Sequence, residues 1–200
     1  MAFSDFTLRA AVEAFGLTEE DGVELFAGTP PMEPSAFLQV WLDEFAPLAL
    51  GLGSEAARSH YIILPFLAEA QRRAAGPVSV LPGVTLDVDK SRGLNGFCDF
   101  IVARSARLYY LRGPLAAVVE AKREDITAGL GQCAASMVAI REFNEQDKTP
   151  VPAVYGAVSS GSAWRFLRLT GAVLAIDRRE YHSEDAASLL GVLVRIASGA

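Results

Sequence analysis

The first 75 residues carry a helical pattern of apolar side chains. From Ser4 to about Ala75 these side chains recur every three or four positions, as Trp41 and Phe45 do. Prolines and glycines divide the region into pieces. Ser54 is placed to cap one of these helices, which Pro65 can bend. We therefore expect this part of the chain to form several helices.

After Gly76 the pattern changes to short runs of β-branched and aromatic residues, which are typical of strands. A helical stripe from about Ile126 to Asn144 divides these runs into two groups. Ser183 and the two acids after it predict a last helix that ends near Gly199. The predicted strands are Val78–Val88, Gly96–Ala103, Leu108–Leu111, Leu115–Ala121, Ala153–Val158, Trp164–Leu169 and Ala172–Ile176.

The order of the predicted elements is helices, strands, one helix, strands and a last helix. This order favours an α/β fold, in which helices flank a central mixed β-sheet. A chain of 200 residues is long enough to bury one sizeable core. We expect an N-terminal helical extension at residues 1–53, packed on an α/β core at residues 54–200 that ends in the C-terminal helix.

Composition and charge narrow the functional classes. The formal net charge is −6, so any phosphate site must be local. No apolar stretch approaches the roughly 18 residues of a membrane span, so we expect no membrane partner. Cys98 and Cys133 lie in apolar stretches and no signal-type segment opens the chain, which favours a cytoplasmic protein. His60 and His182 do not stand at zinc-ligand spacing with these cysteines, so we expect no structural zinc.

Two predicted strands carry charged residues that suggest chemistry. The chain has only three lysines, and one of them, Lys122, closes an apolar strand. Because side chains alternate along a strand, Glu120 and Lys122 lie on one face, whereas Val119 and Ala121 face the core. Asp99 interrupts another apolar strand, where a charge is costly unless it is paired or bound to a metal.

These residues resemble the motif of the PD-(D/E)XK nuclease superfamily. The segment Leu94–Phe100 contains Asp99, and Glu120 follows 21 positions later in Val119–Lys122. Gln132 lies on the next predicted helix. The implied fold is restriction-endonuclease-like.

The resemblance extends beyond these motifs. The hairpin at Ser160–Phe166 is similar to the closing strands of the nuclease domain at the start of type I restriction motor subunits. The whole resemblance covers roughly Ser54–Ile176. One position departs from the family pattern, because Cys98 stands where proline precedes the aspartate.

The resemblance also implies a metal site. Asp99 and Glu120, with the backbone carbonyl of Ala121, would bind Mg²⁺ or Mn²⁺, an ion that takes few protein carboxylates and keeps several waters. A further acid would come from the first helix of the core. Glu55 is the candidate for that position, and Glu69 is the other.

Two further side chains receive roles from the resemblance. Lys122 would orient the attacking water or neutralise charge in the transition state. Gln132 would face the site from the following helix. Together these roles describe a metal-dependent phosphodiesterase that acts on nucleic acid.

Each residue also has a purely structural explanation. Glu120 and Lys122 can form a solvated ion pair at a strand end, and Asp99 can be a buried acid bonded to backbone amides. Glu55 fits an ordinary acid in the first turn of a helix, and Gln132 fits a surface amide. Both histidines lack a visible catalytic partner in the sequence.

Two functions therefore remain open. The first is Mg²⁺-dependent hydrolysis of phosphodiester bonds; the alternative is a nuclease-like fold that serves as a non-catalytic protein-binding or scaffolding module. The intact set of two acids and a lysine favours the enzyme. The acidic chain favours the scaffold and predicts weak binding to nucleic acid in isolation. A homodimer or a separate recognition subunit would then supply further contacts.

Overall fold

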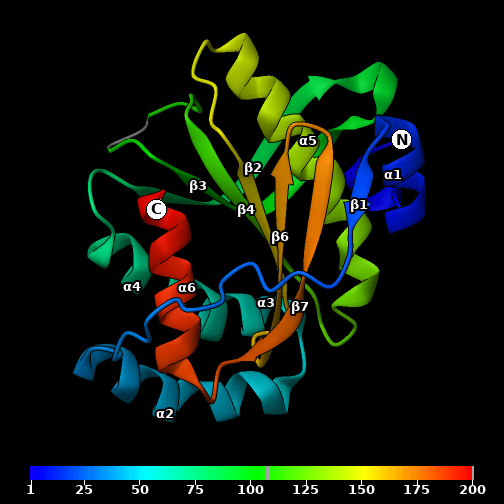
Figure 1. Cartoon of the computed structure of the whole chain (residues 1–200). Coiled ribbons are helices and arrows are strands. Elements are labelled where there is room, and N and C mark those ends of the chain that lie inside the picture. The colour runs from blue at the N-terminus through cyan, green and yellow to red at the C-terminus, as the bar shows by residue number, and fades with distance from the viewer. Residues whose placement is uncertain (107–108, 200) are drawn as a thin grey trace.

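Within residues 1–106 and 109–199, which the computed structural model describes, a mixed sheet of seven strands lies between two layers of helices (Figure 1). The strands are β1 (Thr18–Glu20), β2 (Ser79–Asp89), β3 (Leu94–Ala103), β4 (Leu115–Ala121), β5 (Val154–Ser159), β6 (Ala163–Thr170) and β7 (Val173–His182). Their order across the sheet is β1-β7-β6-β5-β4-β3-β2. The pairs β1–β7 and β4–β5 are parallel, and the other neighbours are antiparallel. The predicted α/β class is confirmed.

Helices cover both faces of this sheet. They are α1 (Leu8–Phe15), α2 (Ala36–Leu52), α3 (Glu55–Arg58), α4 (Leu64–Arg73), α5 (Leu130–Gln146) and α6 (Ala186–Ser198), with a π-helical turn at Ser59–Ile63. The short 3-10 turns are Phe3–Asp5, Lys90–Arg92 and Thr127–Gly129. One layer contains α1 and α5, and the other contains α2, α3, α4 and α6. In the described part of the chain, no helix is long and apolar enough to cross a membrane.

The strand β4 lies inside the sheet, and all of its residues are buried. Val118 belongs to the core that includes Met137 of α5. Val119 belongs to the opposite core, which includes Phe66 of α4. The predicted alternation is confirmed, but both faces are core because helices cover both of them. A charged side chain on β4 is therefore enclosed by protein.

The N-terminal segment is less purely helical than the sequence predicts. Residues Thr18–Glu20 form β1, which adds to the sheet edge by parallel pairing with Val173–Ala175. All three side chains of β1 are exposed, so the strand carries no apolar pattern that sequence analysis could detect. Phe3 and Phe6 join the core beneath α5. The boundary between residues 53 and 54 stays a prediction.

Two other predicted elements differ from the structure. Tyr109–Leu111 form no strand, and the first residue of that predicted strand, Leu108, lies outside the described residues. The last helix is capped by Asp185, whose Oδ1 accepts from the backbone N–H of Ser188 at 3.3 Å, rather than by Ser183. The reason is that β7 continues to His182 and displaces the helix start.

The helical entry to the core is close to the prediction. Ser54 caps α3, because its Oγ accepts from the backbone N–H of Ala57 at 3.1 Å. Pro65 lies in the first turn of α4, which continues directly from the π-helical turn, so its missing N–H removes one helical bond. The carbonyl of Tyr61, four residues back, accepts from Trp41 Nε1 at 3.0 Å instead. The irregularity falls just before it, in the π-helical turn Ser59–Ile63.

Candidate active site on β3 and β4

The sheet brings the two predicted metal carboxylates together. Phe100 of β3 pairs with Val119 of β4. Because this pairing is antiparallel, Asp99 and Glu120 are the next residues on each strand. Two acidic side chains thus stand beside each other, one in the middle of β3 and one near the end of β4.

The Glu120 carboxylate is fully buried, with 0% of the residue exposed. Its Oε1 accepts a hydrogen bond from Ser136 Oγ at 3.0 Å, and its Oε2 accepts one from Gln132 Nε2 at 2.7 Å. Both donors lie on α5 and are four residues apart, so they share one helix face. The burial contradicts the explanation of Glu120 as part of a solvated surface ion pair.

Gln132 also connects Glu120 to the predicted catalytic lysine. The Nζ of Lys122 donates to Gln132 Oε1 at 2.9 Å, while the amide nitrogen of the same side chain donates to Glu120. A chain of hydrogen bonds therefore runs from Lys122 through Gln132 to Glu120. Gln132 is held on both sides, which contradicts its explanation as an ordinary surface amide.

Asp99 is partly exposed and bonds to backbone. Its Oδ2 accepts from the backbone N–H of Ala121 at 2.8 Å. This contact is the one that the structural explanation of Asp99 requires, and it also holds the carboxylate at the end of β4. The ligand role of the Ala121 carbonyl oxygen stays a prediction.

The two neighbouring acids shift the protonation of the site. Burial, and next the negative charge of Asp99, raise the pKa of Glu120 to about 8, against the smaller opposing effects of Lys122 and Ser136. Burial and the charge of Glu120 also raise the pKa of the Cys98 thiol. The site therefore disfavours a second negative charge beside Asp99, and Glu120 keeps a proton that a bound cation would displace.

The structure does not bring Glu55 to these acids. Glu55 is exposed in the first turn of α3, as expected for an ordinary helix-start acid. Across residues 1–106 and 109–199, no group of three His, Cys, Asp or Glu side chains is arranged to hold a metal ion. The expected third carboxylate is therefore absent from the described site, because the short helix α3 points Glu55 into solvent.

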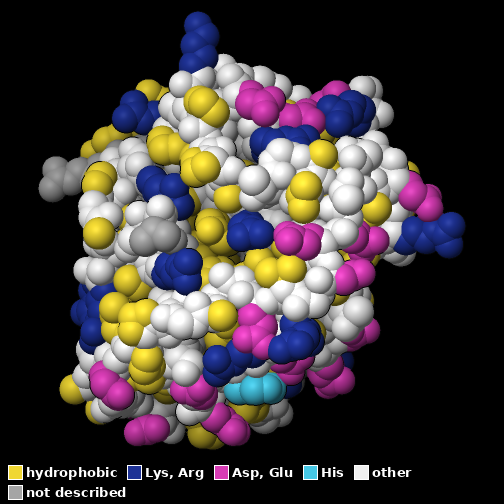
Figure 2. Space-filling model, in the orientation of Figure 1, with side chains coloured by type: hydrophobic (Ala, Val, Ile, Leu, Met, Phe, Trp, Pro, Cys, Tyr) yellow, Lys and Arg dark blue, Asp and Glu magenta, His cyan; other side chains and the backbone are white. Residues whose placement is uncertain are grey.

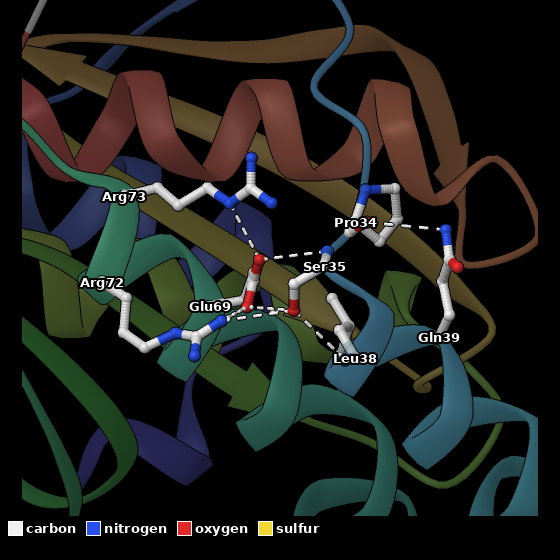
Figure 3. A network of polar contacts seen from close by, with 7 residues as sticks. All are labelled: Pro34, Ser35, Leu38, Gln39, Glu69, Arg72 and Arg73. Carbon is white, nitrogen blue, oxygen red and sulfur yellow. Dashed lines mark hydrogen bonds and ion pairs between the residues drawn. The ribbon is translucent and has the colours of Figure 1, made fainter.

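Glu69, the other candidate, belongs to a separate cluster on the helical layer (Figure 3). Arg73 Nε donates to Glu69 Oε1 at 2.8 Å, and Arg72 forms a second ion pair with Oε2. Ser35, at the start of α2, donates from its backbone N–H at 3.2 Å and from its Oγ at 3.0 Å. Burial by itself would raise the pKa of Glu69, but these donors lower it below the usual value. The cluster ties α2 to α4, and no ligand role remains for Glu69.

An open groove of about 350 Å³ borders Asp99. Its lining includes His60 from the π-helical turn and Phe97 from β3. Sequence analysis assigned neither residue to the site. Ser136 was also missed, although its spacing of four residues from Gln132 on a predicted helix is a signal that could have identified it.

Several basic side chains that the sequence offers as phosphate contacts form ion pairs within the protein. Arg92 Nη1 donates to Glu142 at 2.9 Å, and Arg72 and Arg73 bind Glu69. On the face shown in Figure 2, basic and acidic side chains are intermixed, and the basic ones form no continuous stripe. The expectation of weak binding to nucleic acid stays a prediction.

The site thus combines a buried glutamate, a neighbouring aspartate and a lysine that reaches the glutamate through one amide. No family model, no curated protein and no solved structure matches the chain, so the geometry of this site carries the functional argument by itself.

Proposed function

We propose that this protein hydrolyses phosphodiester bonds of nucleic acid with the help of Mg²⁺ or Mn²⁺ held by Asp99 and Glu120. The observation that carries the proposal is the fully buried Glu120 beside Asp99, linked to Lys122 through Gln132. Burying a carboxylate beside a second acid costs stability, and groups kept in the protein at such a cost are often functional.

The residues fit a hard divalent cation. Two adjacent carboxylates supply the oxygen ligands that Mg²⁺ prefers, and waters and phosphate oxygens can complete its coordination. The raised pKa of Glu120 reflects burial and the charge of Asp99, a charge that a cation would neutralise. When bound, the metal supplies Lewis-acid polarisation of the phosphodiester and a more acidic water.

The protein's own residues divide the remaining work. Gln132 and Ser136 orient the two oxygens of Glu120, and the Ala121 N–H orients Asp99. The ammonium of Lys122, held by Gln132, supplies positive charge where an attacking water or the phosphorane-like charge develops. Lysine suits this role because it is a mobile point charge with three donors.

The same proposal includes the finer features of fold, partners and location. An acid pair on two antiparallel strands, followed by a helix packed against them, supports a restriction-endonuclease-like core. Buried free thiols at Cys98 and Cys133 support a reducing, cytoplasmic compartment. The intermixed charge on the face shown in Figure 2 supports a second copy or a recognition subunit as the source of further nucleic-acid contacts.

One observation favours the non-catalytic scaffold as the second candidate. Asp99 is already bonded to the Ala121 N–H, and no third acid among the described residues joins Asp99 and Glu120 in a metal-binding group. In that case metal has no effect on the protein, and the buried acids serve only the fold.

The test is Lys122→Ala, assayed by digestion of plasmid and oligonucleotides with Mg²⁺ or Mn²⁺. We expect cleavage to fall about 100- to 1,000-fold, because charge stabilisation in the transition state is lost. The control is Lys90→Ala, since Lys90 is exposed and pairs with Asp87 away from the site. If the wild type does not cleave with either metal, or if Lys122→Ala cleaves as well as the wild type, the proposal fails.

A further inference from the structure

The groove beside Asp99 has a lining that suits a nucleotide. Asp99 and Phe97 come from β3, whereas Ser59 and His60 come from the π-helical turn before α4. At about 350 Å³, the groove lies in the size range of small-molecule sites. It combines an aromatic ring, an imidazole and a carboxylate of the candidate metal site.

Phe97 is the feature that needs an explanation. It is 56% exposed, although Cys98 and Phe100 on the same strand are buried. The ring lies against Gly83 of β2, where a Cβ would stand 3.4 Å from the Phe97 Cζ. Gly83 has a positive φ of 66°, a conformation that side chains disfavour. A flat apolar ring is thus held at the groove by the sheet edge and presented to solvent.

His60 adds a polar contact of defined orientation. Its Nδ1 lies 2.7 Å from the carbonyl oxygen of Ala56. Because a carbonyl oxygen only accepts, Nδ1 carries a hydrogen, and Nε2 is the nitrogen through which His60 can meet a ligand. The Leu64 N–H bonds to the Ser59 carbonyl five residues back, and such π-helical turns are frequent at functional sites.

We infer that this groove seats an unpaired nucleotide of the substrate, with its base stacked on Phe97 and an N–H group of the base donating to His60 Nε2. This inference rests on the proposed function and names the substrate class: nucleic acid that is single-stranded at the cleaved position. A base in an intact duplex is already stacked between its neighbours and presents no free face to Phe97. An aromatic platform therefore selects unpaired bases without reading their sequence.

The first experiment measures binding without cleavage. Fluorescence anisotropy follows a short fluorescein-labelled single-stranded DNA, and separately its blunt duplex, in EDTA at low ionic strength with the full chain. We expect the wild type to prefer the single strand and Phe97→Ala to bind it roughly 5- to 100-fold more weakly. Phe97→Trp retains binding, whereas Phe97→Leu does not, because stacking needs an aromatic ring. His60→Ala weakens binding of the single strand and leaves the duplex unaffected.

The matched control is Phe37→Ala. Phe37 is 65% exposed on α2 and does not line the groove beside Asp99. We expect this variant to bind like the wild type. Equal binding by Phe97→Ala and Phe37→Ala, or a preference of the wild type for the duplex, overturns the inference.

The second experiment repeats the comparison as cleavage in Mg²⁺. If the Phe97 variants lose binding in EDTA but the wild type cuts nothing in Mg²⁺, the groove inference stands and the proposed nuclease function fails. If the wild type cuts DNA but Phe97→Ala cuts single strands as fast, the function stands and the groove inference fails.

Discussion

Glu69 and Glu120 are both buried glutamates, with 2% and 0% of the residue exposed, yet their environments have opposite effects. Glu69 meets two arginines and Ser35, and these donors lower its pKa despite burial. Glu120 meets two neutral donors and a second acid, Asp99, and its pKa rises to about 8. Burial is common to both, so the sign of the neighbouring charge makes the difference.

The comparison separates a structural cluster from a candidate site. Around Glu69 the negative charge is balanced within the protein, so the cluster needs no ligand. Around Glu120 the nearest cation, Lys122, is one amide away and does not balance both acids. A buried carboxyl group without a directly bonded cation is the feature that a divalent metal would exploit.

The largest effect of a single substitution on stability is expected at Glu69. Glu69→Gln removes the charge that two arginines bind, and we expect a loss of about 1–3 kcal/mol in the free energy of unfolding, measured by urea denaturation. The loss stays below that of a fully buried pair because Arg72 is 57% exposed. Glu13→Gln is the control, since Glu13 pairs with Arg9 at an exposed site and should cost about 0.5 kcal/mol or less.

That variant also sharpens the comparison. If Glu69 is purely structural, Glu69→Gln keeps any cleavage activity and metal response of the wild type. A loss of metal response in a folded Glu69→Gln protein would show that the two clusters are not separate.

The next effect concerns pH. With a pKa raised from 4.5 to about 8, folded Glu120 holds a proton that the unfolded chain releases. In EDTA the free energy of unfolding should therefore fall as pH rises from about 4.5 to about 8, by at most about 1.4 kcal/mol per pH unit from this group. Thermal melts across this range test the slope.

Glu120→Gln provides the matched comparison for this slope. Glutamine keeps the side-chain shape but does not titrate, so the melting temperature of the variant should depend less on pH than that of the wild type. Identical slopes in the two proteins would mean that Glu120 ionises in the folded state as it does in the unfolded chain.

The smallest effect is the response to metal. At ten times its Kd, Mg²⁺ should stabilise the wild type by about 1.4 kcal/mol, which is a few degrees in melting temperature. Above about pH 8, where Glu120 is ionised, Asp99→Asn should melt higher than the wild type in EDTA, because repulsion of Glu120 is removed, and it should not respond to Mg²⁺. In the scaffold alternative the same substitution lowers the melting temperature and metal changes neither protein.

Much of the fold follows from local pattern. The run Leu115–Ala121 was predicted as a strand with the same bounds as β4, because every residue in it is apolar except Glu120. The stripe on Ile126–Asn144 predicted α5, although its first turn is a 3-10 turn. In contrast, β1 exists only because its backbone pairs with β7, and its exposed side chains carry no signal.

The candidate site was only partly readable in the same way. Alternation along one strand placed Glu120 away from Val119, and motif resemblance selected Asp99, Lys122 and Gln132. The resemblance also selected Glu55, but the structure leaves that side chain exposed at the start of the short helix α3. Neither alternation nor resemblance reached His60 and Phe97, because a groove forms between elements that are distant along the chain.

The sequence by itself thus determined the strands and helices that show a regular pattern of apolar side chains. It also identified the two acids and the lysine, Asp99, Glu120 and Lys122, that lie on or next to those strands. The tertiary structure alone decided which buried glutamate is paired with arginines and which keeps its proton. The physical reason is that a charge interacts through space with whatever packs beside it: two arginines of its own helix for Glu69, and an aspartate from a neighbouring strand for Glu120.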